Sequence, residues 1–187
     1  MLSQFTADGD KLTLAQLSDF PKDVYPVGRL DADSEGLLIL TNDKELNHRL
    51  LNPKFKHSRT YLVQIEGSVT DEAIGKFCSG VIITVEGKTY QTLPAKATIL
   101  SINPILPVRN PPIRFRKNKP TSWIEFTLYE GKNRQVRKMT ASIGFPTLRL
   151  VRKSIEGINI GDMQPGEVIA LQKENIYHLL FDNKNLK

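Results

Sequence analysis

The chain has little of what several classes of protein require. It contains one cysteine, Cys78, so a disulfide within the chain is excluded, and we expect this side chain to be a small core residue. Its histidines, His48, His57 and His178, are far apart, so no metal site is expected. No apolar run reaches the roughly 18 residues of a membrane span, and no signal-peptide pattern stands at the start. We therefore expect a cytoplasmic protein that binds neither a metal nor a membrane.

The composition is that of an ordinary folded protein. With 187 residues, of which 40% are hydrophobic and 25% charged, the chain can form one domain, or two closely joined lobes, with a sizeable core. The same composition excludes intrinsic disorder.

The positive charge is concentrated in one part of the chain. The formal net charge is +6, but residues 109–153 hold 12 of the 26 Lys and Arg against two acidic residues, a net charge of +10. The other 142 residues carry a net charge of −4. A basic segment joined to a slightly acidic body is typical of a surface that binds a polyanion. Composition alone leaves open the alternative of a solvated basic surface without a partner.

Two segments carry the start and stop signals of helices. In residues 42–51, Asn42 and Glu45 have the spacing of a capping box, and an Asn-Pro pair follows the segment. Thr70 is expected to cap a second helix that runs to residue 79 and stops at Gly80.

Strands are expected at residues 36–41, 59–67, 95–102 and 122–129. The first is an apolar run typical of a buried strand, and the second and fourth alternate between apolar and polar residues. Because helices and strands do not alternate as in βαβ units, the fold class is predicted to be α+β with a mixed, mostly antiparallel sheet.

The strand at 122–129 has two aromatic residues on one side. Ile124, Phe126 and Leu128 are predicted to face inward, so Trp123 and Tyr129 face outward. These two rings could stack on nucleic-acid bases or be covered by a neighbouring loop, and the sequence leaves both open.

A third helix is predicted within residues 131–146. Its apolar face consists of residues at helical spacing, Val136, Met139 and Ile143, and it ends at Gly144. The basic side chains away from this face are Arg134 and Lys138, with Arg137 on its flank. Because no acidic residue within the helix pairs with them, phosphate contacts are favoured over a solvated face.

The stretch VGRLDADSEGLLILTND, residues 27–43, carries a cluster of carboxylates. Asp31, Asp33 and Glu35 match the first ligand positions of a calcium loop, but position 12 is Asn42 where a bidentate Glu is needed. Calcium is therefore disfavoured. Asp31 precedes a loop that leads into the predicted buried strand. A carboxylate there can act at the lip of a cleft or simply cap its own turn, and both interpretations are open.

Two long motifs resemble those of one family. VGRLDADSEGLLILTND is similar to the catalytic motif of bacterial ribosomal RNA pseudouridine synthases, and EGKNRQVRKMTASIGFPTLRLVR, residues 130–152, is similar to the second signature of the same branch. The stretch RNPPIRFRKNKPTSWIEFTLYEGKNRQVRKM most resembles the E-type enzymes that act on the large subunit. The resemblance covers roughly residues 2–167, and the two motifs stand in the family's order.

The resemblance implies an isomerase that breaks the bond between N1 of uracil and the ribose and rejoins the base through C5, with no cofactor or metal. The family's aspartate matches Asp31, its active-site tyrosine matches Tyr61, and the basic residue of its later motif matches Arg137. Asp31 must be ionised to act as nucleophile or base, and we expect Arg137 to pair with it. Tyr61 is expected to pack on the uracil and to help remove the C5 proton. The residues expected to contact RNA phosphates are Arg29, Arg134, Lys138 and Arg152.

The same resemblance implies one catalytic domain over residues 1–187, built of two lobes with a central sheet, flanking helices and a basic cleft. The accessory N-terminal RNA-binding domain of many relatives is missing, and so is the strand that usually precedes Gln4, so either the chain is shortened or the sheet lacks an edge. Residues 168–187 extend past the usual end, and Ile176, Leu179 and Leu180 are expected to dock as a short helix. The expected partner is large-subunit ribosomal RNA, bound by a monomer.

A function of a different class also stays open. The same scaffold without turnover would be a ribosomal RNA-binding or assembly factor. An enzyme requires Asp31, whereas a binding factor requires only the basic surface.

Overall fold

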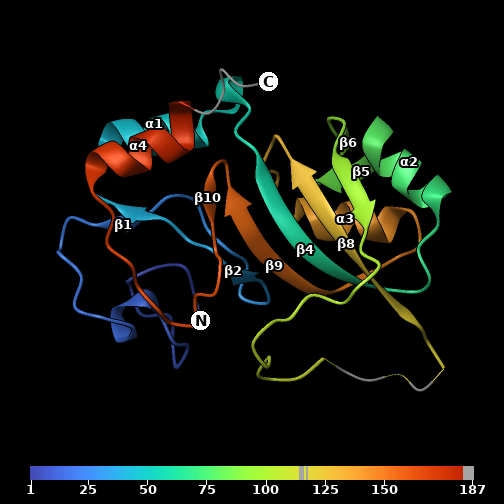
Figure 1. The fold of residues 1–187 in the computed structure, drawn as a ribbon, viewed down its shortest axis with the longest axis horizontal. Helices are drawn as coiled ribbons and strands as arrows, with labels where there is room; N and C mark the ends of the chain where they lie inside the picture. Colours follow the sequence, from blue (N-terminus) through green and yellow to red (C-terminus); the bar gives the residue numbers. More distant parts are fainter. Residues whose placement is uncertain (114–115, 117, 183–187) are drawn as a thin grey trace.

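In the computed structural model, which describes residues 1–113, 116 and 118–182, a six-stranded sheet forms the centre of the fold (Figure 1). Its strands are β2 (Glu35–Gly36), β4 (Arg59–Glu66), β7 (Lys96–Ile99), β8 (Thr121–Leu128), β9 (Thr147–Ile155) and β10 (Ile158–Asn159). The order is β10-β9-β4-β8-β7, and β2 pairs with β9. Only the β2–β9 pair is parallel among these described strands, so the predicted α+β class with a mixed, mostly antiparallel sheet is confirmed. Arg114 and Lys117, two cations of the predicted basic segment, lie outside the described residues.

The middle strand β4 has apolar residues on both faces because both faces of the sheet are covered. Val63 and Ile65 are fully buried on one face, and Leu62 is buried on the other. Across the β4–β8 pair, Val63 lies opposite Ile124, so the two buried rows share one face. The alternation predicted for 59–67 and 122–129 is therefore confirmed.

The helices are α1 (Lys44–Leu51), α2 (Asp71–Ser79), α3 (Gln135–Ser142) and α4 (Lys173–Phe181). The predicted cap of α1 is wrong: Asp43, and not Asn42, accepts hydrogen bonds from the backbone N–H groups of Glu45 and Leu46 at 2.9 and 3.1 Å. The Asn42 amide instead donates to the carboxylate of Asp23. The cap of α2 by Thr70 and its end at Gly80 are confirmed.

The run at 36–41 is not one buried strand. Its start forms β2 with β9, and its end forms β3 (Leu40–Thr41), which pairs with β1 (Tyr25–Pro26) in a separate two-stranded sheet. The chain leaves the central sheet after Gly36, the one residue of this run that pairs with β9 as part of β2 (Glu35–Gly36). The apolar side chains of Leu37 and Ile39 are nevertheless buried.

Five further elements differ from the prediction in extent or were not predicted. The strand expected at 95–102 is limited to β7, and one further hydrogen bond, from the N–H of Leu100 to the Trp123 carbonyl, joins the following residue to β8. A hairpin of β5 (Ile82–Val85) and β6 (Lys88–Gln91) packs beside α3, and its short strands carry too few alternating residues to stand out in the sequence. Single turns of 3₁₀ helix occupy Leu14–Gln16 and Pro53–Phe55.

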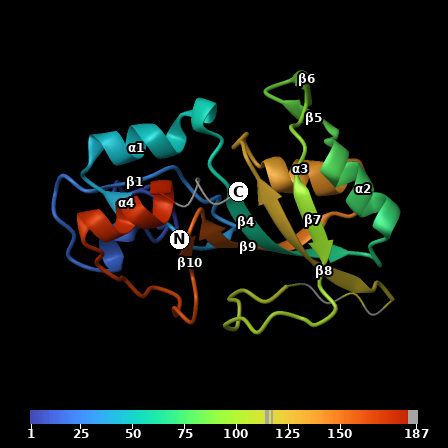
Figure 2. The same cartoon turned by 45° about the horizontal axis from the view of Figure 1, so that its top comes forward.

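The apolar core has two large clusters of side chains. The helix pairs that contribute to them, α2 with α3 and α1 with α4, lie at opposite ends of the central sheet (Figure 2). One joins α2 and α3 to the sheet through residues such as Phe77 and Met139, and the rings of Phe77 and Phe126 meet edge to face at 5.0 Å. The other joins α1 and α4, where Leu180 is buried and Ile176 and Leu179 pack beside it. The helix predicted at the C-terminal end is confirmed. None of the helices within the described ranges is long and apolar enough to cross a membrane.

The structure decides the placement of two side chains, one that the sequence left open and one that it predicted wrongly. Trp123 is only 8% exposed. It forms a small buried cluster with Leu62 and Val151, and Leu100 and Leu106 of the loop after β7 pack over this cluster. Base stacking by Trp123 is therefore excluded in this conformation, and the alternative of cover by a loop is confirmed. Cys78 is exposed on α2 and is not a core residue, because the buried face of that helix is formed by Ala73 and Phe77.

Candidate active site

Asp31 lies in a short loop that is fixed on both sides. Before it, the Ser3 hydroxyl both accepts from the N–H of Leu30 and donates to its carbonyl, at 3.0 and 3.2 Å. After it, the N–H of Ser34 closes a turn onto the Asp31 carbonyl at 2.9 Å, and β2 then pairs with β9. The Asp31 side chain is 31% exposed, so its carboxylate faces the surface from a held backbone.

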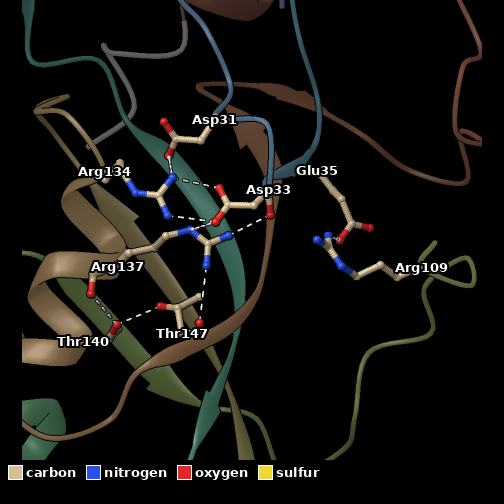
Figure 3. A network of polar contacts seen from close by, with 8 residues as sticks. All are labelled: Asp31, Asp33, Glu35, Arg109, Arg134, Arg137, Thr140 and Thr147. Carbon is tan, nitrogen blue, oxygen red and sulfur yellow. Dashed lines mark hydrogen bonds and ion pairs between the residues drawn. The ribbon is translucent and has the colours of Figure 1, made fainter. Parts of the chain in front are cut away.

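Two arginines of the α3 region reach this loop (Figure 3). Arg134 makes two hydrogen bonds to the Asp33 carboxylate, at 2.9 and 2.8 Å, and its Nη1 lies 3.6 Å from Oδ2 of Asp31. Arg137 is 12% exposed; its Nη2 donates to the Asp33 carbonyl at 2.8 Å and its Nη1 to the Thr147 carbonyl at 3.4 Å. The two guanidinium groups therefore join α3, the Asp31–Asp33 turn and the start of β9.

The expected pairing of Arg137 with Asp31 is wrong in this structure. Arg134 makes the ion pair with Asp31, while Arg137 contacts the backbone and, at 3.4 Å from Nε, the carboxylate of Asp33. The cause lies in the backbone, since Arg134 caps α3 in the left-handed region, at φ +52°, ahead of the helical turn that carries Arg137. Asp33, which the sequence offered only as a disfavoured calcium ligand, is the carboxylate that both arginines share.

The turn before α3 is held by a buried carboxylate that the sequence analysis did not single out. Glu130 accepts hydrogen bonds from the N–H of Leu93 at 2.8 Å and from the Gln135 amide at 2.6 Å, and Gln135 accepts in turn from the N–H of Lys132 at 2.9 Å. A further hydrogen bond from Tyr90 raises the pKa of that phenol to about 12. Because a left-handed residue other than glycine is costly, this support helps to hold Arg134 in place.

The charges of the network act on one another. The hydrogen bonds from Arg134 hold the pKa of Asp33 below its ordinary value, with help from the nearby Arg137 and against the effect of burial. Burial lowers the pKa of Arg137, and the attraction of Asp33 opposes this shift. Asp33 therefore stays ionised and keeps both guanidinium groups close to Asp31.

A second carboxylate holds the long loop between β7 and β8. Glu35 pairs with Arg149 at 2.7 Å and with Arg109, and Arg149 also donates to the Pro107 carbonyl at 2.8 Å. Burial opposes ionisation of Glu35, but hydrogen bonds from Arg149 and Arg109 lower its pKa overall. A pocket of about 320 Å³ lies between this loop and the network, lined among others by Asp33, Arg109 and Arg137.

Tyr61 is connected to the Asp31 loop through the sheet. It lies in β4 opposite Arg152 of β9, which is in turn the partner of Gly36 in β2. Arg152 is only 4% exposed, so its predicted phosphate contact is wrong: the side chain points into the protein and its Nε donates to the Leu37 carbonyl at 2.7 Å.

The other predicted phosphate ligands remain near the surface. Arg29 is exposed two residues before Asp31. Lys138 is half-buried, and its Nζ lies 3.4 Å from the Asn133 side-chain oxygen. Arg134 is 41% exposed while it pairs with Asp33. Within the described ranges, no group of three or more His, Cys, Asp or Glu is placed to hold a metal ion.

Comparisons with known proteins identify the family of the chain. A family model described as RNA pseudouridylate synthase matches residues 3–142. Ribosomal large subunit pseudouridine synthase E of Vibrio parahaemolyticus is 51% identical over 171 residues, which are 91% of this chain and 69% of the relative. The protein of the same name from Xanthomonas campestris is 46% identical over 169 residues, which are 89% of this chain and 88% of the relative. A crystal structure of a pseudouridylate synthase matches with a TM-score of 0.74 and 28% identity, over 92% of this chain and 67% of that one. This chain belongs to the RNA pseudouridylate synthase family.

Proposed function

We propose that this protein isomerises uridine to pseudouridine in large-subunit ribosomal RNA and that the carboxylate of Asp31 is its essential group. The observation that carries the proposal is the position of this carboxylate, partly exposed on a loop fixed on both sides and 3.6 Å from the Arg134 guanidinium. The choice of RNA rests on the relatives, two of which are named ribosomal large subunit pseudouridine synthase E.

One carboxylate is sufficient for this reaction. Glycosidases generally use two, because one must protonate a leaving group or activate water. In an isomerisation the departing uracil is kept and rejoined to the ribose through C5, so no water has to attack. The carboxylate must be ionised to act as nucleophile or base, and a cation within about 4–6 Å favours that form. Arg134 is such a cation.

Arg137 contributes to the reaction mainly by holding the turn that carries Asp31, and less by placing its positive charge near the Asp31 carboxylate. Its bonds to the carbonyls of Asp33 and Thr147 fix the turn that carries Asp31 against β9. Removing this side chain would release the turn and take away a donor from the carbonyls of Asp33 and Thr147, so we expect a loss of turnover with little loss of RNA affinity.

The remaining predicted residues have supporting roles. Tyr61, partly buried in β4, packs on the uracil that has left its stack. Arg29, Arg134 and Lys138 contact phosphates on the surface around Asp31. The whole chain acts as one catalytic domain and as a monomer.

The test is tritium release from large-subunit ribosomal RNA that carries the label at C5 of uridine. The new bond at C5 must expel that hydrogen, so release reports the reaction itself. The wild type is expected to release tritium, and Asp31→Asn is expected to be slower by at least about 10³-fold while RNA binding is retained. Asp10→Asn, a change of the same kind at an exposed site, is the matched control and is expected to keep full activity.

Two outcomes would contradict the proposal. Turnover by Asp31→Asn at the rate of the wild type would remove Asp31 from the mechanism. Tight RNA binding without release by the wild type, on naked RNA and on ribosomal subunits alike, would identify a binding factor instead.

A further inference from the structure

Arg152 is a buried cation that the proposed reaction has not used. It is 4% exposed, and its Nη2 has no hydrogen-bond partner among residues 1–113, 116 and 118–182. Arg134 and Arg149 each meet a carboxylate, whereas no described carboxylate pairs with Arg152. A buried guanidinium without a counter-charge is unfavourable for folding, so its presence calls for a role in function.

The backbone around Arg152 is fixed. A Cβ at Gly36 would lie 2.6 Å from the backbone nitrogen of Arg152, so β2 approaches β9 as closely as only glycine allows. The Arg152 carbonyl accepts from the N–H of Leu37 at 2.9 Å, and its Nε donates back to the Leu37 carbonyl at 2.7 Å. One edge of the guanidinium is thereby held, and the Nη edge is left for another partner.

A polar side chain of the neighbouring strand β4 that acts on this guanidinium is that of Tyr61. Tyr61 and Arg152 lie directly opposite each other in β4 and β9, where side chains on one face are neighbours. Burial lowers the pKa of Arg152, and charge attraction and a hydrogen bond with Tyr61 oppose the shift. The other charged group of the described residues that acts on Arg152 is Arg59, a cation. A phenolate at position 61 would therefore face a cation held in place by the fold.

We propose that Arg152 is a positioning residue for Tyr61: it holds the phenol toward the uracil and stabilises negative charge on the phenolic oxygen while Tyr61 takes the proton from C5. This inference rests on the proposed role of Tyr61. In the step, the C5–H bond breaks after C5 has bonded to C1′, and its electron pair restores the C5=C6 double bond. The C5 proton passes to the phenolic oxygen of Tyr61 as the hydroxyl proton of Tyr61 passes to water, and N1 of the uracil gains a proton from solvent.

The test measures pseudouridine formation in single turnovers on ribosomal RNA with hydrogen or deuterium at C5 of uridine. Arg152→Met keeps the volume but removes the charge. We expect it to slow the first-order rate by about 10-fold to 100-fold, part of the 10²–10⁴ that a proton-transfer group contributes, at nearly unchanged RNA affinity. The deuterium isotope effect is expected to rise, because C5–H cleavage becomes slower relative to the other steps.

Three comparisons separate this role from a structural one. Arg152→Lys keeps the charge and is expected to recover part of the rate. Lys153→Met, a change at the next residue of β9, which pairs with Glu125, is expected to leave rate and isotope effect as in the wild type. Tyr61→Phe combined with Arg152→Met is expected to be no slower than Tyr61→Phe alone, because Arg152 acts through Tyr61.

The inference and the proposed function fail in different ways. If Tyr61→Phe is fully active, the proton transfer from C5 to the Tyr61 hydroxyl is wrong, while packing of the ring on the uracil, which Phe retains, is not contradicted. If Tyr61→Phe is slow but Arg152→Met, folded as judged by thermal unfolding, keeps the wild-type rate and isotope effect, only the inference about Arg152 is wrong.

Discussion

The two faces of the central sheet are covered in different ways. On one face, α2 and α3 pack on a continuous apolar cluster that includes Phe77, Phe126 and Met139. On the other face, the loop after β7 covers a small apolar patch around Trp123 and is then held by ion pairs from Glu35 to Arg109 and Arg149. The helical face depends on apolar burial, whereas the loop face depends largely on charge. The free energy of unfolding should therefore fall when a cavity is made on the helical face, and it should depend on pH through the ion pairs of the loop face.

The largest effect is expected from a cavity on the helical face. Phe77→Ala removes a fully buried ring that meets Phe126 at 5.0 Å, and the rigid sheet behind it limits collapse of the cavity. The free energy of unfolding is expected to fall by about 3–5 kcal/mol, measured by urea denaturation. A loss below about 1 kcal/mol would show that the helical face does not depend on this burial.

A smaller effect is expected on the loop face from Glu35→Gln. Two arginines lose their charged partner, so the free energy of unfolding at pH 7 is expected to fall by about 1–2 kcal/mol. The pKa of Glu35 is lowered in the folded protein from an ordinary value of 4.5, so its stabilisation is fully present above that value and is lost as the pH falls through the folded pKa. The difference between wild type and variant should therefore be constant near pH 7 and vanish in acid.

Glu72→Gln is the matched control for that experiment. Glu72 pairs with Lys76 on the exposed side of α2, and an exposed pair of this kind contributes little to stability. No measurable change in unfolding is expected at pH 7. A difference between Glu35→Gln and wild type that persisted unchanged at pH 3 would mean that the loop is held by shape and not by charge.

The smallest effect on stability, with a clear effect on binding, is expected on the solvent side of α3. Replacing Arg134 and Lys138 together by Ala should change the free energy of unfolding by less than about 1 kcal/mol, because both side chains lie near the surface. The plot of log affinity for RNA against log salt should become flatter, by roughly 0.7–0.9 for each phosphate that the variant no longer neutralises. An unchanged slope, measured by filter binding at several salt concentrations, would exclude this side of α3 from the RNA interface.

Local patterns predicted most of the regular structure. The alternation of apolar and polar residues predicted β4 and β8. The capping residue Thr70 and the glycines Gly80 and Gly144 predicted the bounds of α2 and the end of α3. These patterns could be read from the sequence because they act between residues that are close along the chain. The choice between neighbouring capping residues was wrong, since Asn42 is drawn away by Asp23, which is 19 residues earlier.

The details of the site depend on contacts between distant segments, and the sequence alone did not supply them. Arg134 and Arg137 are equally plausible partners of Asp31 by type and spacing, and the left-handed backbone at Arg134 decides between them. Arg152 looks like one more surface cation until β2 and β4 bury it from both sides of β9. The burial of Trp123 likewise requires a loop whose path only the fold determines.

The absence of a side chain at Gly36 limits which insertions and deletions the chain can accept near Asp31. Because a Cβ there would collide with the backbone of Arg152, β2 can sit against β9 only at this residue pair. A shift by one residue would bring Glu35 or Leu37 to the point of closest approach and would turn every neighbouring side chain to the opposite face. The number of residues between Asp31 and Gly36 therefore fixes where the proposed catalytic carboxylate lies relative to the sheet. An insertion or deletion between these two residues would move the carboxylate away from that position, because β2 cannot shift along β9 to compensate.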